Sequence, residues 1–315
     1  MRLLFAFALA VSGAFAAAPP QAEIANADLR AKLYLPDAQN GYYRGTRFDW
    51  AGVVLSLQQK GHEYFGVWFP PERYTPTLHD AITGPVDSFE AIGYDTAAVG
   101  GKFLRIGVGW LKRPDAPRVD NFRTYDVVDG GAWKTRKGAD WIEFTQTLKD
   151  TYVYTKRLRL VKNRLVVEHS LKNTGNTPLE TNVFNHDFFM LDHQPTGPDI
   201  VVKFPFEPKS GEDWRGPGEV RAKQIVYKQE LGGAQGQNNG ESVNGTITGY
   251  GASASDYDFR VENTKTGVGV HETGDRPIAR LYFWSIRTTV CPEAYVKVHA
   301  DPGKTDKWVT NFEFY

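Results

Sequence analysis

The sequence predicts an all-β fold, on three observations. Runs rich in β-branched and aromatic residues recur at spacings of roughly 8 to 15 residues, which is typical of sandwiches and barrels. Turn residues such as glycine and asparagine separate these runs. After residue 18, the sequence lacks an amphipathic repeat of helical period long enough to form a packed helix.

The expected strands share a high content of valine, isoleucine, threonine, phenylalanine, tyrosine or tryptophan. In chain order they are residues 52–57, 103–108, 141–148, 152–161, 164–171, 181–189, 200–206, 224–227, 256–262, 267–271, 280–286, 295–299 and 308–315. Turns separate them, with clear examples at residues 162–163, 173–176, 244–245 and 265–267. Residues 28–33 are expected to form a short helix or to lead into the fold. The glycine-rich residues 232–251 predict a long loop rather than a domain boundary.

The first 18 residues predict a secretory signal peptide. Arg2 supplies a positive charge, an apolar stretch follows at residues 3–11, and Ala14-Phe15-Ala16 matches a cleavage pattern. No later run approaches the ~18 apolar residues of a membrane-spanning helix. We therefore expect residues 19–315 to form a single domain in a periplasmic or secreted protein that is not membrane-bound after cleavage.

Charge and motifs exclude several classes of function. Lys plus Arg and Asp plus Glu both number 37, so nucleic acid is not an expected partner. Cys291 is the only cysteine and allows no internal disulfide; we expect it to be buried and inert.

The sequence has no G-x-S-x-G motif, phosphate-binding loop or dinucleotide fingerprint, so no cofactor is expected. His186, Asp192 and His193 lack the usual spacing of metal ligands, and no metal is expected. The oligomeric state stays open.

Aromatic residues are abundant, with 8 Trp, 15 Tyr and 19 Phe. Strand cores account for most of them. Aromatic faces also stack on the C–H faces of pyranose rings, so some are expected to line a sugar-binding cleft.

Two residues are the principal candidates for catalysis. His186 lies in the strand-like segment Asn185-His186-Asp187-Phe188-Phe189, and alternation places it on one face with Phe184 and Phe188. Glu293 follows Cys291-Pro292 and precedes a β-rich C-terminal tail. A histidine that donates a proton and a carboxylate that accepts one can open and close a sugar ring at its anomeric carbon. The alternatives are a core histidine and a solvated carboxylate at the end of a strand.

This order of motifs resembles the galactose mutarotase-like (aldose 1-epimerase) superfamily. In that family a Thr-x-His-x-Tyr/Phe-Phe segment carries the acid, and a late glutamate before a Pro-Gly turn carries the base. The corresponding features here are Thr181 to Phe189, Glu293, and Asp301-Pro302-Gly303. The resemblance implies an antiparallel β-supersandwich. It also implies that His186 protonates the ring oxygen, for which an unperturbed pKa of ~6.5 is suitable, and that Glu293 accepts the proton of the anomeric hydroxyl.

The resemblance also implies an arginine from an early strand and a second histidine. Arg47 or Arg44 is expected to contact the sugar near its ring oxygen, and Trp50 could supply a stacking wall. A surface arginine paired with Asp49 is the alternative for Arg47. His79 is the better placed second histidine, ahead of His62. Asp192 could hold a hydroxyl, and Trp284 either stacks on the ring or belongs to the core.

Three functions remain open. The first is an exported aldose 1-epimerase-like isomerase that binds a sugar or an oligosaccharide end. The second is a non-catalytic carbohydrate-binding protein, and the third is a polysaccharide lyase-related module. The feature that discriminates the first function from the second is whether His186 and Glu293 face each other across one cleft, roughly one sugar ring apart.

Overall fold

The computed structural model of the chain describes residues 18–233 and 241–315. The predicted signal peptide, apart from residue 18, and seven residues of the predicted loop at 232–251 lie outside this range. Residues 242–248 of that segment form a strand, so the predicted loop and the predicted turn at 244–245 are wrong there. Within the described part of the chain, no helix has the length and apolar character needed to cross a membrane.

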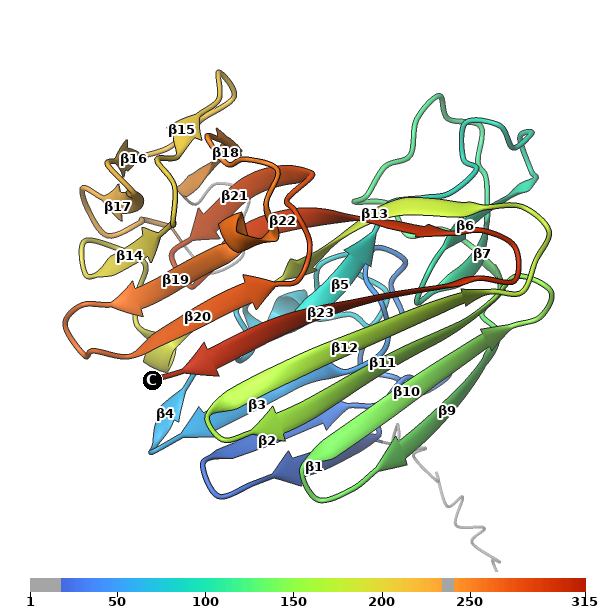
Figure 1. Ribbon diagram of the computed structural model, residues 1–315, viewed down its shortest axis with the longest axis horizontal. Helices are drawn as coiled ribbons and strands as arrows, with labels where there is room; N and C mark the ends of the chain where they lie inside the picture. Colours follow the sequence, from blue (N-terminus) through green and yellow to red (C-terminus); the bar gives the residue numbers. More distant parts are fainter. Residues whose placement is uncertain (1–17, 234–240) are drawn as a thin grey trace, which may run out of the picture.

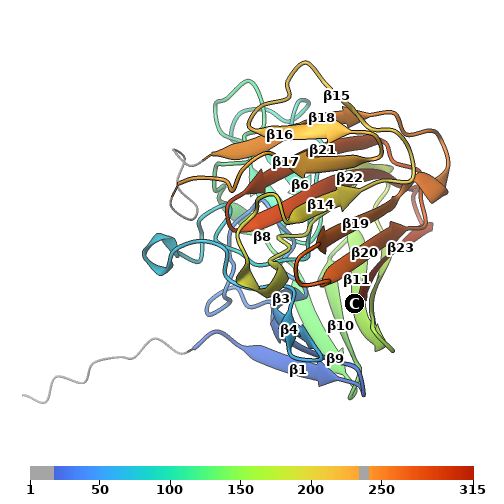
Figure 2. The ribbon, with the colours of Figure 1, turned by 90° about the vertical axis from the view of Figure 1, so that its left-hand side faces the viewer.

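The structure contains two large antiparallel sheets and two small ones (Figures 1 and 2). The ten-stranded sheet has the order β16 (Gly218–Arg221), β17 (Gln224–Tyr227), β14 (Ile200–Lys203), β19 (Asp258–Asn263), β20 (Gly269–Gly274), β23 (Thr305–Phe314), β12 (Arg164–Asn173), β11 (Tyr152–Val161), β10 (Trp141–Leu148) and β9 (Ala132–Lys137). The six-stranded sheet has the order β15 (Lys209–Ser210), β18 (Ser242–Thr248), β21 (Arg280–Ile286), β22 (Thr289–Ala300), β13 (Leu179–His186) and β5 (Val86–Phe89).

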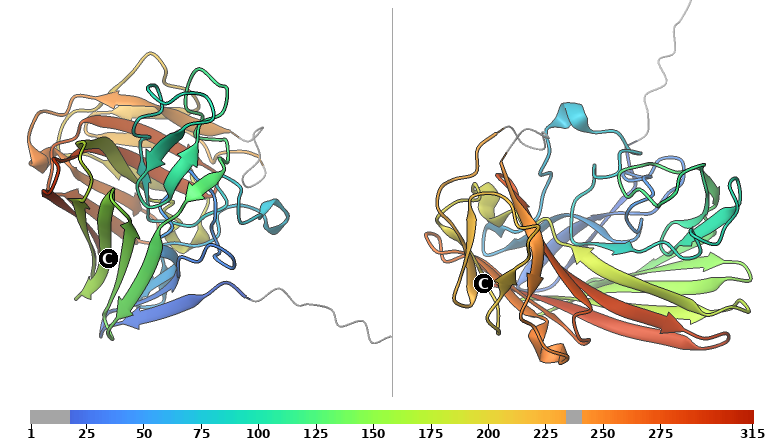
Figure 3. Two further views of the ribbon diagram at one scale, coloured as in Figure 1. Left: turned by 90° about the vertical axis from the view of Figure 1, so that its right-hand side faces the viewer. Right: turned by 90° about the horizontal axis from the view of Figure 1, so that it is seen from above.

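The small sheets lie at the periphery. One is formed by β1 (Gln21–Ala25), β2 (Leu29–Tyr34), β3 (Val53–Gln59) and β4 (His62–Glu63). The other is formed by β6 (Lys102–Arg105), β7 (Gly109–Lys112) and β8 (Val127–Asp129), whose green-to-teal segment lies at one end of the molecule in Figure 3. Three short 3-10 helices complete the described part: η1 (Pro71–Arg73), η2 (Leu191–His193) and η3 (Ala254–Asp256).

The two large sheets pack face to face through alternating apolar side chains. In β11 every second residue is buried, beginning with Tyr152, because successive side chains of a strand point to opposite faces. Phe89 of the six-stranded sheet contacts Tyr154 and Trp308 of the ten-stranded sheet, with ring centroids 5.6 and 6.1 Å apart. This arrangement confirms the predicted antiparallel β-sandwich.

The strand predictions succeed where alternation is long. Strands β10, β11, β17 and β21 coincide with the predicted ranges 141–148, 152–161, 224–227 and 280–286. Strand β22 begins well before the predicted residue 295, so Glu293 lies within a strand rather than at its end. The expectation of a short helix at residues 28–33 is wrong. Leu29, Ala31 and Leu33 alternate inward along β2 and bury apolar surface only in an extended conformation.

A buried ion cluster joins the two large sheets. The Nζ atom of Lys156 on β11 lies 2.6 Å from Asp87 on β5 and 3.6 Å from Asp49. His169 on β12 approaches Asp87 with an Nε2–Oδ2 distance of 3.0 Å, and Tyr154 donates a hydrogen bond to Asp49. Burial would raise the pKa of Asp87, but the contacts with His169 and Lys156 hold it below its usual value. The cluster therefore fixes the position of β5 and of the segment before β3.

Removing the cation of this cluster should destabilise the fold strongly. The Lys156 side chain is 1% exposed, so Lys156→Met leaves two buried carboxylates without their main counter-ion. We expect a loss of about 3 to 5 kcal/mol in the free energy of unfolding, measured by urea denaturation. Lys203→Met, which removes the half-exposed partner of Glu262, should cost less than about 1 kcal/mol. Equal losses in the two variants would contradict the role of the cluster.

Candidate active site

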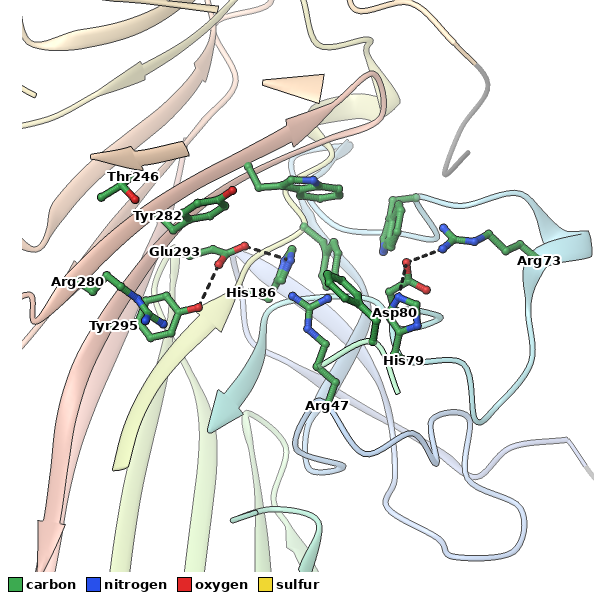
Figure 4. A pocket seen from close by; sticks show the side chains of 14 residues that line it. Arg47, Arg73, His79, Asp80, His186, Thr246, Arg280, Tyr282, Glu293 and Tyr295 are labelled. Carbon is green, nitrogen blue, oxygen red and sulfur yellow. Dashed lines mark hydrogen bonds and ion pairs between the residues drawn. The ribbon is translucent and has the colours of Figure 1, made fainter. Parts of the chain in front are cut away.

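A cavity of about 770 Å³ opens between the six-stranded sheet and the loops that connect the N-terminal strands (Figure 4). Its size is in the range of small-molecule sites in proteins. The lining residues are Arg47, Trp68, Arg73, His79, Asp80, Phe122, His186, Phe188, Thr246, Arg280, Tyr282, Trp284, Glu293 and Tyr295.

His186 lies in the middle of this cavity, at the end of β13. Its ring stacks on Phe188 with centroids 3.8 Å apart and contacts Trp284 edge-on at 5.4 Å. Phe184, two residues earlier in the strand, also contacts the imidazole. These aromatic contacts leave His186 only 3% exposed. The apolar alternation of the segment thus holds the imidazole in one orientation.

Cys291 determines which ring nitrogen faces the cavity. Its Sγ atom lies 2.8 Å from Nδ1 of His186 and accepts a hydrogen bond from the backbone N–H of Asp187 at 2.9 Å. Burial raises the pKa of the Cys291 thiol well above its usual value, so the sulfur is a neutral partner. The contact occupies Nδ1 and leaves Nε2 as the nitrogen available for proton transfer.

Glu293 lies beside this free nitrogen. Its Oε1 atom is 3.4 Å from Nε2 of His186, and its Oε2 atom accepts a long hydrogen bond of 3.5 Å from Tyr295. Both partners are almost completely buried. The two groups share one cleft. They are closer than one sugar ring, however, so the expected separation is wrong: both side chains extend from adjacent parts of one sheet face.

Burial shifts the two pKa values in opposite directions. It raises the pKa of Glu293 to about 7, although Arg47 and Arg280 oppose the shift. Burial, together with the positive charge of Arg47, lowers the pKa of His186 well below its usual value. An unperturbed histidine pKa of ~6.5 was expected, and this expectation is wrong because the ring lies in an apolar environment. In the ligand-free protein the pair is a neutral imidazole beside a carboxyl group that titrates near neutrality.

Three arginines surround the pair. Arg280 stacks on Tyr295, with its guanidinium carbon 3.7 Å from the ring centroid, and forms an ion pair with Glu90 at 2.8 Å. Arg73 pairs with Asp80 at 2.6 Å, on the opposite wall. Arg47 lies over the rings of Phe48 and Phe122 and extends toward His186 (Figure 4).

The structure brings together five of the predicted site residues. His186, Glu293, Arg47, His79 and Trp284 all line the cavity. His79 approaches Asp80 with an Nε2–Oδ2 distance of 3.4 Å and contacts the ring of Phe122 edge-on. It therefore occupies the wall opposite Glu293 rather than the immediate surroundings of His186 (Figure 4).

Three predicted sugar contacts are absent from the cavity lining. Trp50 is buried in the core, where its indole N–H donates to the carbonyl of Gly45. Asp192 pairs with His62 at 2.8 Å on another part of the surface. Arg44 is half-buried and is not among the residues that line the cavity. Proximity in sequence suggested these residues, but the chain turns between each of them and the site.

Sequence reasoning missed the sheet residues that frame the pair. Arg280 and Tyr282 lie on the same face of β21 as Trp284, and Tyr295 lies on the same face of β22 as Glu293. A period of two places residues i, i+2 and i+4 on one strand face. Once Trp284 and Glu293 were candidates, this rule alone would have identified their neighbours.

His186, Cys291 and Glu293 also form a set of potential metal ligands, with donor atoms within 4.8 Å of one another. The arrangement does not favour a single ion, because the thiol lies at Nδ1 and the carboxyl at Nε2, on different edges of the ring. A metal would also require a thiolate, whereas burial raises the pKa of Cys291.

Comparisons with known proteins identify the fold. No protein-family model matches the sequence, and no curated protein matches it. Solved structures do match over nearly the whole chain. The Slr1438 protein from Synechocystis sp. PCC 6803 has a TM-score of 0.56 and 11% identity, covering 97% of this chain and 99% of its own. The GalM/aldose epimerase homologue from C. elegans has a TM-score of 0.54 and 13% identity, covering 95% of this chain and 99% of its own.

A galactose mutarotase-like protein from Clostridium acetobutylicum has a TM-score of 0.53 and 12% identity, covering 94% of this chain and 95% of its own. This is the galactose mutarotase-like fold. The predicted resemblance is thereby confirmed at the level of architecture. Within this fold, the cavity combines a histidine and a glutamate on neighbouring segments of the six-stranded sheet.

The buried Glu293 should make stability depend on pH in a specific way. Its folded pKa of about 7 exceeds the ordinary value of 4.5, so the unfolded chain loses this proton first and the free energy of unfolding falls as pH rises between these values. Glu293→Gln removes this penalty. We expect the free energy of unfolding of the variant, relative to that of the wild type, to increase by on the order of 2 to 3 kcal/mol as the pH rises from about 5 to 8.

The measurement is urea denaturation of both proteins at each pH. Glu168→Gln, on a half-exposed strand face, is the matched control and should show no such trend. A pH-independent difference between Glu293→Gln and wild type would show that Glu293 titrates like a solvated carboxylate.

Proposed function

We propose that the protein is an exported aldose 1-epimerase-like isomerase, with His186 as the acid and Glu293 as the base. The observation that carries the proposal is the placement of both side chains in one cavity, with Nε2 and Oε1 3.4 Å apart. A neighbouring acid and base, each with a free polar atom, can act on two adjacent atoms of one substrate.

The close spacing suits the anomeric centre of a pyranose. The hydroxyl oxygen O1 and the ring oxygen O5 are bonded to the same carbon, C1. A base that reaches the proton on O1 and an acid that reaches O5 must therefore lie side by side. His186 and Glu293 satisfy this requirement without a conformational change, whereas groups on opposite sides of a ring would not.

The reaction balances with one mobile proton on the pair. In the reactive form His186 is protonated and Glu293 is ionised. Nε2–H gives its proton to O5 as the C1–O5 bond breaks, and Glu293 takes the proton of O1 as the C1=O bond forms. After rotation about the C1–C2 bond, the carboxyl returns its proton to O1 and His186 takes the proton of O5, so the ring closes as the other anomer.

The walls of the cavity provide the remaining interactions. Trp284 and Tyr282 offer apolar faces for the C–H surfaces of a sugar ring, whereas the ring of Tyr295 already stacks with Arg280. Trp68 and Phe188 close the base of the site behind His186. The Arg47 guanidinium supplies a fixed fork of donors for hydroxyl or ring oxygens.

Anomer interconversion tests this proposal directly. Freshly dissolved α-glucose and α-galactose are followed by polarimetry or saturation-transfer NMR, with and without protein. We expect acceleration over the blank, and a loss of at least about a hundredfold in kcat/KM for His186→Ala and for Glu293→Gln, because each removes one proton-transfer group. His62→Ala, outside the cavity, should retain the wild-type rate.

Two results would contradict the epimerase proposal. Acceleration that survives in both variants would place the chemistry elsewhere. Absence of acceleration on every aldose tested, with sugar binding still detectable by NMR, would instead support a non-catalytic carbohydrate-binding protein.

The pH profile should reflect the single proton of the pair. Above the pKa of Glu293, which is about 7, the pair loses this proton and His186 no longer has one to donate. We expect kcat/KM, corrected for the blank at each pH, to be constant from about pH 5.5 to 6.5 and then to fall about tenfold per pH unit above pH 7. A rate that rises through pH 7 would show that the ionised carboxylate acts with a neutral imidazole.

A further inference from the structure

Within the part of the chain that the structure describes, the Arg47 guanidinium forms no ion pair with a carboxylate. Among residues 18–233 and 241–315, the other cavity arginines are both compensated, Arg73 by Asp80 and Arg280 by Glu90. No carboxylate of the described chain lies within 4.0 Å of the Arg47 guanidinium, and no acceptor there takes a hydrogen bond from it. It lies over the rings of Phe48 and Phe122, and it extends into the cavity beside His186 (Figure 4).

Arg105, which contacts the backbone of Arg47, is a second cation without an ion-pair partner among the described residues. Arg105 is 1% exposed, and its guanidinium donates to the carbonyls of Thr46 and Arg47 at 3.0 and 3.3 Å and to the side chain of Asn121 at 2.8 Å. None of these acceptors carries a charge. Burial and the nearby Arg47 lower the pKa of Arg105 to about 10. Two buried or half-buried cations without a counter-ion are costly, because buried charges are normally paired.

The position of Arg47 indicates which part of a bound sugar would lie next to its positive charge. In the proposed reaction His186 faces O5 of the sugar and Glu293 faces O1. Arg47 lies on the His186 side of the pair (Figure 4). The atom next to O5 on that side of a pyranose is C5, so the group attached to C5 is the part of the sugar expected to meet the guanidinium.

A negative charge at this position would also assist the reaction. The positive charge of Arg47 opposes protonation of His186, yet the proposed reactive form requires the imidazolium. A neutral sugar does not change this effect of Arg47 on the pKa of His186. An anion bound to Arg47 neutralises its charge and so makes protonation of His186 more favourable.

We propose that the preferred substrate is an acidic aldose of the hexuronate type, whose carboxylate on C5 pairs with Arg47. This inference rests on the proposed epimerase function and specifies its substrate class. A single guanidinium fork matches one planar carboxylate in a bidentate pair. A phosphate dianion would need further cations for charge compensation, but Arg73 and Arg280 already form ion pairs with Asp80 and Glu90.

The first experiment compares sugars that differ only at C6. Anomer interconversion is measured at about pH 6 for galacturonate against galactose and for glucuronate against glucose, each corrected for its own uncatalysed rate. Glucose 6-phosphate and glucose 6-sulfate distinguish a carboxylate site from a general anion site. We expect kcat/KM to be on the order of 10- to 100-fold higher for the uronate than for its neutral parent, as charge-assisted hydrogen bonds allow. Equal values, or a preference for the phosphate, would overturn the proposal.

The second experiment assigns the preference to Arg47. Arg47→Gln should lose the preference for the uronate, with a larger loss on galacturonate than on galactose. Arg280→Gln is the matched control, since it removes a cavity arginine that already has a partner; it should affect both sugars to the same extent. Melting temperatures of both variants show whether they are folded. Equal losses on the two sugars in folded Arg47→Gln would overturn the assignment.

Binding separates this inference from the proposed function. Titration calorimetry with galacturonate and galactose on Glu293→Gln measures affinity without turnover. Tighter binding of the uronate, abolished by adding Arg47→Gln, supports the acidic ligand even when no anomer interconversion is detected on any sugar. Equal affinities for the two sugars reject the acidic ligand, whatever the outcome of the activity assay.

Discussion

The ion pair between Lys156 and Asp87 is the contact on which the geometry of the rest depends. It joins β11 of one large sheet to β5 at the edge of the other, at a distance of 2.6 Å and without access to water. The backbone N–H of Asp49 donates to the carbonyl of Asp87, so the same point also fixes the segment that carries Arg47 and Phe48. Strand β5 in turn pairs with β13 up to His186. One buried charge pair thus positions the arginine, the aromatic wall and the histidine relative to one another.

Desolvation explains the electrostatics of the cavity. The strands that form it bury aromatic side chains on both sides of His186, and the same apolar surroundings raise the pKa of Glu293 and of the Cys291 thiol. In a fully solvated pair that shares one proton, the imidazole would carry the proton and the carboxylate would be ionised. Burial instead favours the neutral combination, in which the single mobile proton lies on the carboxyl. This is the protonation state that the proposed reaction gives after ring opening, with Glu293 protonated and His186 neutral.

The parts that could be predicted from the sequence are those with a local physical signal. Strict alternation set the bounds of β10 and β11, and the apolar neighbours of His186 indicated its strand face. The sequence did not decide between a short helix and a lead-in segment at residues 28–33, because their alternation is short and mixed with charged residues. Trp50 and Asp192 were misplaced because neither has a periodic signal that relates it to the cavity. The 3.4 Å approach of His186 to Glu293 arises between strands 107 residues apart in sequence, and no local pattern encodes such a distance.

Two groups of buried charges in this fold differ in whether their charges are paired with opposite charges, and this difference bears on function. The cluster of Lys156, Asp87, Asp49 and His169 contains both signs in contact, and its cost of burial is offset within the protein. The group of Arg47 and Arg105 contains one sign only, and Glu293 holds a proton near neutrality instead of an arginine partner. A chain selected for stability alone has no reason to retain unmatched charges in its interior, whereas ligand sites commonly do. Arg47 lines the cavity, and its unmatched charge is the physical reason for assigning the chemistry there and for expecting the missing charge on the ligand.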